Sequence, residues 1–412
     1  MLENFGHNRI TNSNGGSGTE EHRTPGASGD CSGLTAGTED EKASAYNRAK
    51  RILLVSELGT GIAFLVVLLL SGISITLARW LEAETGNVWL VILLYLVCIG
   101  LVYDLFAVPL DFYGGFILEH KYGQSTQTFW AWLWDQAKGK LVGLAIAAPL
   151  IEAVYWLLRS YPQTWWLIAG GMFIAFAIVM ANVAPIVLMP IFYTFVPLKD
   201  EKLRSRLMAL CERANTSVRG VYEMDMSRKT RAANAALAGI GNTRRIILGD
   251  TLLDRYEPDE VEAILAHELG HHKSWDMWKG LVFQSAISLL GLYLSYVVLN
   301  TYSGSFGFRG PADVAAFPLF MLTVAGVSLL FLPTSNAFSR RLERRADSFA
   351  LSLTRNPRAF VSMMGKLGQQ NLSEFEPNPL VEFMLFSHPS ISKRIRAARE
   401  AFPDEFAVIE GS

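Results

Sequence analysis

Long apolar segments separated by charged blocks constrain the fold of this chain more than any other feature. Each is apolar and long enough to cross a hydrocarbon core about 30 Å thick as a helix. There are six, near Ile52–Ala78, Val88–Leu110, Leu141–Leu158, Trp165–Met189, Leu281–Leu299 and Phe317–Leu332. Half of all residues are hydrophobic and only 18% are charged, which is typical of membrane proteins. The sequence therefore predicts a mostly α, multi-pass transmembrane helical bundle with about six spans.

The composition of the intervening segments divides the chain into five parts. They are a disordered tail (1–46), a membrane domain with four spans (47–198), the first part of a catalytic domain (199–278), a membrane hairpin with two spans (279–337) and the second part of the catalytic domain (338–412). The tail is rich in Gly, Ser, Thr and Asn and lacks apolar periodicity. Strand-like runs near Val221–Met226 and Arg245–Leu248 predict a small β-sheet in the catalytic domain.

Basic residues beside the spans predict which side of the membrane the catalytic domain faces. One side carries most of them, namely Arg48, Lys50, Arg51, Lys121, Lys138, Lys140 and the basic catalytic segments. The other side has mainly Arg79, Arg159 and Arg309. Because basic residues favour the cytoplasmic side, both termini and the catalytic domain are expected in the cytoplasm. We expect the bacterial cytoplasmic membrane, or the endoplasmic reticulum membrane in a eukaryote.

A His-Glu-x-x-His pattern at residues 267–271 carries the clearest chemical signal. Pro258 and the acidic residues after it favour the start of a helix just upstream. Two imidazoles four residues apart, His267 and His271, then lie on one helical face and can bind one zinc ion. Glu268 can remove a proton from the water that attacks a peptide carbonyl. The pattern predicts one Zn²⁺ per chain and hydrolysis of peptide bonds.

A catalytic zinc ion needs a third protein ligand, and Glu343 is the candidate. The three cysteines show no metal-binding spacing, so histidine and carboxylate remain as ligands. Two membrane crossings separate His271 from Glu343, which returns Glu343 to the same side of the membrane. Asp347, one helical turn further, could accept the outer N–H of a zinc-bound histidine. Both acids lie among arginines, so exposed ion pairs are the alternative for each.

In these features the chain resembles the integral-membrane zinc CAAX prenyl endopeptidases of the sterile-mutant type. The resemblance covers roughly residues 50–400. It rests on the pattern at 267–271, Glu343 with Ala346-Asp347, residues 228–235 and 246–253, Ser387-His388-Pro389 with Arg394, and the polar loop at 119–128. It implies a gluzincin-like zinc protease domain on the cytosolic side of the helical bundle.

The resemblance also implies roles for three residues outside the metal site. His388 and Arg394 would bind substrate or stabilise the developing oxyanion, and Asn234 would belong to an edge strand where the peptide lies. An ordinary surface histidine is the alternative for His388. The chain departs from the family at Ala236, where an aromatic residue is typical, and in its six spans, where eukaryotic members have seven.

Together these observations predict a zinc-dependent membrane endopeptidase, similar to CAAX prenyl proteases. Its partners would be the lipid bilayer and a peptide or membrane-protein substrate, including a prenylated C-terminal peptide. The net charge of -1 gives no basis for nucleic-acid binding.

Two alternatives remain open. One is a quality-control metalloprotease that cuts membrane proteins without lipid modification. The other is a transporter-like or scaffold bundle with a structural zinc ion, in which acids within the spans would be the functional residues. Glu268 argues against the second, because a structural site needs no general base.

Overall fold

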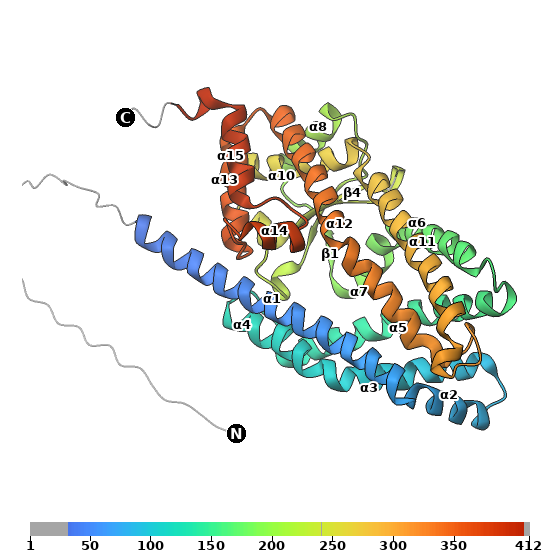
Figure 1. Cartoon of the computed structure of the whole chain (residues 1–412). Coiled ribbons are helices and arrows are strands. Elements are labelled where there is room, and N and C mark those ends of the chain that lie inside the picture. The colour runs from blue at the N-terminus through green and yellow to red at the C-terminus, as the bar shows by residue number, and fades with distance from the viewer. Residues whose placement is uncertain (1–31, 240, 408–412) are drawn as a thin grey trace, which may run out of the picture.

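The computed structural model describes residues 32–239 and 241–407, and these are mostly helical (Figure 1). Among them, 6 helical segments are long and apolar enough to cross a membrane, which confirms the predicted number. These segments are Asp40–Ser71, Val88–Lys121, Phe129–Ser160, Trp165–Phe192, Asp276–Tyr302 and Val314–Thr354. Four precede the catalytic sequence motif and two follow it, in the order expected from the apolar runs.

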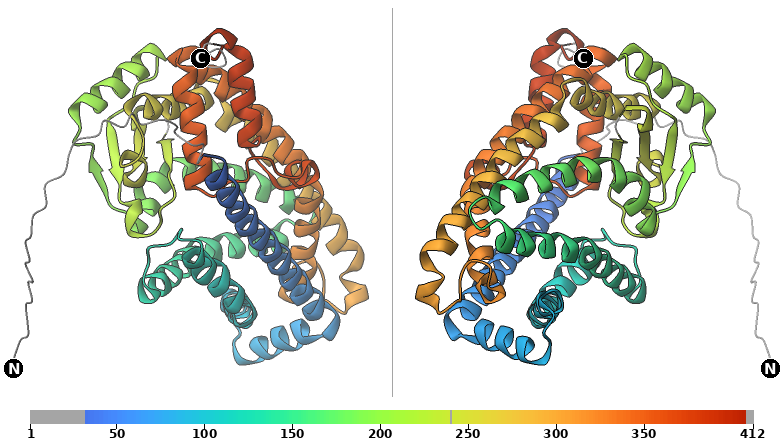
Figure 2. Two further views of the ribbon diagram at one scale, coloured as in Figure 1. Left: turned by 90° about the vertical axis from the view of Figure 1, so that its left-hand side faces the viewer. Right: turned by 90° about the vertical axis from the view of Figure 1, so that its right-hand side faces the viewer.

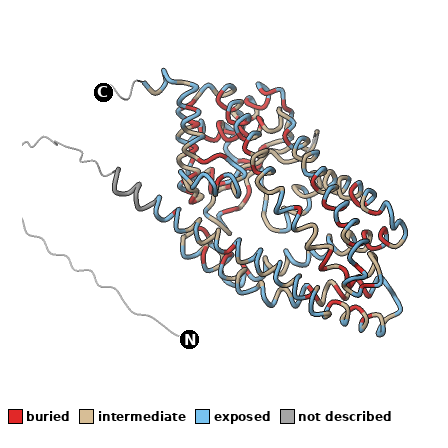
Figure 3. Tube along the Cα trace, viewed as in Figure 1, coloured by how far each residue is buried: buried red, intermediate tan, exposed pale blue. Residues whose placement is uncertain are grey.

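The helices of the membrane part expose large apolar side chains. They are α1 (Ser32–Ser71), α2 (Ile73–Glu84), α3 (Val88–Phe112), α4 (Leu118–Lys121), α5 (Phe129–Ser160), α6 (Trp165–Val183), α7 (Met189–Phe192), α11 (Asp276–Tyr302) and α12 (Phe317–Thr354). Leu105 is 74% exposed and Leu330 is 73% exposed. Figure 3 shows exposed and intermediate positions along much of these helices. An apolar outer surface of this kind suits contact with lipid rather than water.

The prediction of a disordered tail is wrong for residues 32–46, because α1 begins at Ser32. Residues 1–31 lie outside the described residues. Near the start of the helix Ala43 is buried, and the Tyr46 hydroxyl donates a hydrogen bond to Glu119 over 2.9 Å. This polar segment contacts other polar parts of the protein, and those contacts stabilise it. Its composition alone gave no sign of these partners.

Gly72 ends the first long helix earlier than the apolar run predicts. The predicted span continued to about Ala78, whereas α1 ends at Ser71. Gly72 has φ 75°, a left-handed conformation that glycine adopts without steric cost. The rest of the run therefore forms α2, a separate helix of 12 residues that is too short to cross the membrane.

A four-stranded sheet supports the catalytic domain. Its strands are β1 (Phe195–Pro197), β2 (Val221–Met224), β3 (Ala235–Ala238) and β4 (Arg245–Gly249), in the order β1-β2-β4-β3. β2 and β4 are parallel, whereas β1 and β3 pair antiparallel with their neighbours. The two predicted runs became β2 and β4. β1 lies before residue 199, so the sheet also includes residues of the predicted membrane domain (47–198). β3 forms one edge.

Helices on either side of the membrane hairpin complete the catalytic domain. They are α8 (Glu201–Arg213), α9 (Asp250–Leu253), α10 (Pro258–Lys273), α13 (Pro357–Gln370), α14 (Pro379–Leu385) and α15 (Ile391–Ala401). Figure 2 shows the strands and these helices gathered at one end of the long helices. Their shared core includes Leu248 of β4, Leu265 of α10 and Phe360 of α13, all fully buried. α12 continues from the membrane part into this domain and packs along α10.

Candidate metal centre and peptide-binding edge

Helix α10 carries both motif histidines, and its sequence explains its position. Pro258 occupies the first turn, and Glu257 and Glu260 form a capping box that satisfies free N–H groups. Its apolar stripe packs into the core shared with β4 and α13. His267 and His271 share a different face, because residues four apart lie one above the other on a helix. The helix therefore holds both imidazoles toward α12.

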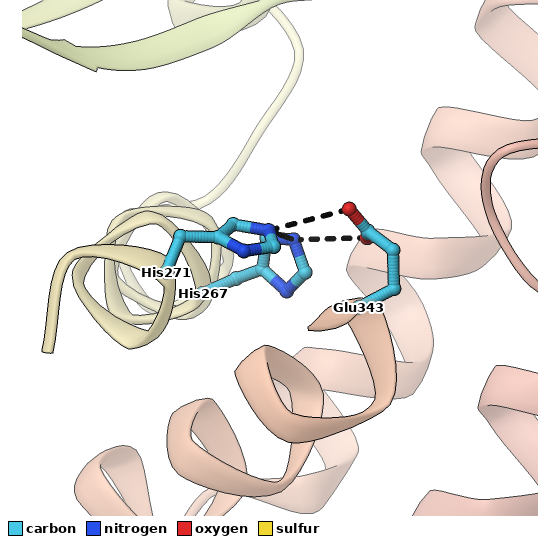
Figure 4. Close-up of side chains that lie close together, drawn as sticks. All are labelled: His267, His271 and Glu343. Atoms are coloured by element: carbon cyan, nitrogen blue, oxygen red, sulfur yellow. Dashed lines mark hydrogen bonds and ion pairs between the residues drawn. The ribbon is translucent and has the colours of Figure 1, made fainter. Parts of the chain in front are cut away.

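The two histidines and Glu343 converge on one point (Figure 4). The Nε2 atoms of His267 and His271 are 3.2 Å apart. One Glu343 oxygen lies 3.3 Å from His267 Nε2, and the other lies 3.3 Å from His271 Nε2. The three candidate ligand atoms lie within 4.8 Å of one another. These are the separations expected for atoms that are each about 2 Å from one metal ion.

The chemistry of this group fits zinc. Two imidazole nitrogens and one carboxylate oxygen form a donor set found in catalytic zinc sites, which keep a fourth position open. Glu343 is 6% exposed, and its buried Oε2 makes no hydrogen bond of good geometry with the described residues. A buried carboxylate oxygen without such a bond is costly unless a cation compensates it.

A close contact between α10 and α12 brings Glu343 to the histidines. A Cβ atom on Gly270 would lie 2.9 Å from Ala346 Cα and 3.1 Å from the Ala346 carbonyl oxygen. A larger residue at position 270 would therefore push the two helices apart. The small pair Gly270 and Ala346 allows the helices to approach until the carboxylate meets the imidazoles.

The outer nitrogen of His267 contacts Asp347. Asp347 Oδ1 lies 2.9 Å from His267 Nδ1, and Arg394 Nε donates to the other Asp347 oxygen over 2.9 Å. Burial lowers the pKa of His267, but the interactions with Asp347 and Glu343 outweigh burial and raise that pKa to about 9. The same negative charges favour any cation bound at this point. Asp347 pairs with Arg394 of α15 rather than with its neighbouring arginines on α12.

Asp276 contacts the outer nitrogen of His271, although it was not among the residues predicted for the site. Its Oδ2 lies 3.1 Å from His271 Nδ1, and the residue is 5% exposed. Trp275 has a left-handed backbone with φ 58°, so the chain turns sharply between α10 and α11 and returns Asp276 to the histidine. A metal-binding histidine usually gives its outer N–H to a carboxylate. This rule, together with the presence of an acidic residue five positions after His271, could have indicated Asp276 from the sequence.

Glu268 lies between the histidines and the edge strand. Burial raises the pKa of Glu268 above the ordinary value, while the positive charge on His267 and His271 opposes this rise. The backbone N–H of Leu237 in β3 lies near this carboxylate and also opposes the rise, since α10 packs against β3. Glu268 therefore faces the strand along which a peptide could bind.

The structure also brings His388 and Arg394 to this site. His388 lies in the loop between α14 and α15, with its Nε2 3.2 Å from Glu343 Oε1. Its side chain is 59% exposed and is therefore accessible to a substrate. Arg394 is only 9% exposed and donates to Asp347. This geometry places Arg394 behind His267, where it can hold Asp347 in position.

Asn234 directly precedes β3 and is exposed. Its carbonyl accepts a hydrogen bond from the Gly249 N–H over 2.9 Å, so its backbone faces β4. β3 has a neighbour only on the β4 side within the described sheet. The other side of β3 is an edge to which an extended peptide can add as a further strand.

The bundle and the site together define a multi-pass membrane metallopeptidase. Residues 197–402 match the family model of peptidase family M48. Residues 32–194 match a model described as CAAX prenyl protease N-terminal, five membrane helices. The chain therefore belongs to peptidase family M48 and is a membrane metalloendopeptidase. In this chain the N-terminal match contains four helices of spanning length and the shorter α2.

Relatives along most of the chain agree with this assignment. An uncharacterized metalloprotease, YhfN of Bacillus subtilis, is 32% identical over 87% of this chain and 85% of its own length. A CAAX prenyl protease 1 homolog of Oryza sativa is 29% identical over 71% of this chain and 70% of its own. The crystal structure of S. mikatae Ste24p has the same fold, with a TM-score of 0.79, 22% identity and coverage of 88% and 89% of the two chains.

Proposed function

We propose that the chain is a zinc endopeptidase in which one Zn²⁺ is held by His267, His271 and Glu343. The observation that carries this proposal is the convergence of these three side chains beside Glu268. When bound there, zinc would supply a Lewis acid that polarises the reacting groups. Asp347 and Asp276 would orient the two imidazoles through their outer nitrogens.

The residues of the chain itself would perform the proton transfers and position the substrate. Glu268 would remove a proton from the attacking water and then pass it to the leaving amine, as a general base and then a general acid. His388 would donate a hydrogen bond to the oxygen of the attacked carbonyl, since it is exposed and lies next to Glu343. Arg394 would position Asp347 and His267. The edge at Asn234 and β3 would hold the peptide in extended form.

The proposed substrates are peptides or membrane proteins that approach from the lipid bilayer, including prenylated C-terminal peptides. The relatives named CAAX prenyl protease 1 support this substrate class. Their matches are longer than the catalytic domain and therefore extend into the membrane part. No observation on this chain favours a transporter or scaffold, or a protease limited to quality control.

A matched pair of peptides tests the substrate class. The purified full chain, in lipid nanodiscs and with its zinc content measured, would receive one peptide with and without a farnesyl group on a C-terminal cysteine. We expect kcat/KM to be at least roughly tenfold higher for the farnesylated form, because burying its hydrocarbon contributes favourable free energy. Equal cleavage of both would indicate a quality-control type of specificity. Zinc-loaded protein that cleaves neither would contradict the proposal.

We also propose that the catalytic domain faces the cytoplasm, and cysteine labelling tests this. Single cysteines would replace the exposed residues Gly86 and Ser305, at one end of the spans, and Ser217 in the catalytic domain, in a variant without the native cysteines. An impermeant thiol reagent should label positions 86 and 305 in intact cells. Position 217 should react only after permeabilisation, because basic residues favour the cytoplasmic side. The reverse pattern would overturn the orientation.

A further inference from the structure

The backbone groups on the open edge of β3 belong to alternate residues. Ala235 pairs with Leu248, and Asn234 accepts the hydrogen bond from Gly249. In an antiparallel ladder such bonded pairs recur at every second residue. Asn234, Ala236 and Ala238 therefore turn their N–H and C=O groups to β4. Ala235 and Leu237 turn theirs to the open edge.

The next position on this edge is occupied by a side chain. Ala233 lies two residues before Ala235, so its N–H and C=O groups would also face the open edge. The Ala233 N–H donates to Asn371 Oδ1 over 2.9 Å, and Asn371 Nδ2 donates to the Ala233 carbonyl over 3.2 Å. The amide of Asn371 thus forms the two hydrogen bonds that a peptide strand would make with Ala233. A peptide bound along β3 cannot continue past Ala235 in this direction.

A strained turn holds Asn371 in this position. Asn371 caps the C-terminus of α13, and Leu372 follows with φ 49°, a left-handed conformation that is unusual for a bulky residue. The Ser373 N–H closes the turn on the Gly368 carbonyl over 2.8 Å. Asn47 of α1 donates to the Leu372 carbonyl over 2.6 Å. Backbone strain persists where the surroundings enforce it, and here it aims the amide at the strand edge.

A pocket of about 440 Å³ opens beside Asn371. Its apolar lining includes Leu367 of α13, Phe386 at the end of α14 and Ile391 of α15. His388, Glu374 and Arg394 also line it, so the pocket has a polar side next to its apolar one. The pocket therefore lies between the end of the peptide edge and a side chain of the candidate catalytic site. A peptide that meets Asn371 has a side-chain pocket available at that point.

We propose that Asn371 fixes the register of the bound peptide and that the pocket between Asn371 and His388 takes one apolar side chain. This inference rests on the proposed endopeptidase function. β3 packs against α10, with Leu237 near Glu268, the proposed general base, and Ala233 lies four residues away, about 13 Å along an extended strand. The apolar residue should thus lie a constant distance, about two to four residues, from the cleaved bond. Asn371 is a positioning residue in this scheme.

Mapping of cleavage sites tests the register. One leucine would be moved stepwise along an otherwise Gly/Ser-rich version of the peptide pair described above, and products would be identified by mass spectrometry. The wild-type chain should cleave at one constant offset from the leucine. Asn371→Ala should add bonds two residues away, because a shift of two keeps the side chains on the same face. Leu367→Ala should keep the offset but reduce the preference for leucine over glycine roughly tenfold.

A matched control separates register from stability. Asn356 caps the other end of α13, where its side chain accepts from the Ala359 N–H. Asn356→Ala should lower the melting temperature without changing the cleaved bonds. Asn371→Asp retains an acceptor for the Ala233 N–H and serves if Asn371→Ala does not fold. Unchanged cleavage sites in the folded Asn371 variant, or a variable offset in the wild-type chain, would overturn the proposal.

Photocrosslinking tests the same pocket without turnover. The Glu268→Gln chain would be mixed with the same peptides carrying photo-leucine, and crosslinked residues would be identified. Crosslinks to Leu367 or Phe386 that weaken at least several-fold in Asn371→Ala would support the register even if no peptide is cleaved. In that case the proposed function alone would fail. Crosslinks elsewhere would overturn the pocket assignment.

Discussion

Glu268→Gln should abolish cleavage while the protein keeps its fold and its zinc. The substitution removes the proton acceptor and leaves His267, His271 and Glu343 in place. General acid-base catalysis contributes about 10²–10⁴-fold, so kcat should fall by at least that order. Glutamine has nearly the same shape, and the amide can still meet the β3 edge. Peptide cleavage, zinc content and melting temperature measured on one preparation would check this result.

Glu262→Gln is the matched control for this prediction. Glu262 lies on the same helix, but its carboxylate pairs with Arg206 Nε over 2.7 Å, away from the histidines. Such a partly exposed ion pair is worth about 0–1 kcal/mol, so activity should stay near that of the wild-type chain. Near wild-type cleavage by Glu268→Gln, or loss of zinc from it, would show that the assigned role of Glu268 is wrong.

Glu343→Ala should lose zinc under mild chelation and become inactive. Glu343 supplies one of three proposed ligands, and its buried position rules out the exposed ion pair that its neighbouring arginines suggested. Loss of an exposed pair would change stability by only about 0–1 kcal/mol, whereas loss of a ligand should weaken metal binding severely. Chelator competition followed by metal analysis measures the difference. Arg344→Ala, at the adjacent exposed position, is the control and should retain zinc.

Asp347→Ala should give a milder defect than Glu343→Ala. It removes the partner of the outer nitrogen of His267, a loss that typically weakens metal binding about 10–100-fold. It also leaves Arg394 without its nearest carboxylate, so the melting temperature should fall. Some activity should survive.

Stoichiometric zinc in Glu343→Ala under the same chelator would contradict the prediction for Glu343 and would require another third ligand. His388 would be the first candidate, since its Nε2 lies 3.2 Å from Glu343.

Local sequence patterns were sufficient to predict the features that depend on a single helix or a single membrane span. The spacing of His267 and His271 places both imidazoles on one face in any α-helix, because the helix repeats every 3.6 residues. The length of each apolar run predicted a spanning helix for a similar reason, since the hydrocarbon core has a nearly constant thickness. Glu343 was the candidate on a predicted helix, and the two crossings after His271 supported it by returning it to the same side of the membrane.

Other residues of the site could be recognised only in the folded chain. Asp276 reaches His271 through the left-handed turn at Trp275, a conformation that no local propensity predicts for tryptophan. The start of α1 looks like a disordered tail in the sequence because its stabilising contact is made with a residue far along the chain, from Tyr46 to Glu119. Composition describes a segment in isolation, whereas these contacts come from its tertiary partners.

The sequence by itself determined the membrane bundle, the helical pair of histidines, the candidate general base and the candidate third ligand. Tertiary structure decided how closely α10 and α12 approach at Gly270 and which strand of the sheet is the open edge. It also placed Asn371 on that edge. The physical reason is that the periodicity of a sequence and the length of an apolar run determine the structure of a single helix or strand. Contacts between elements depend on packing, where a single missing Cβ or one side-chain amide decides the geometry.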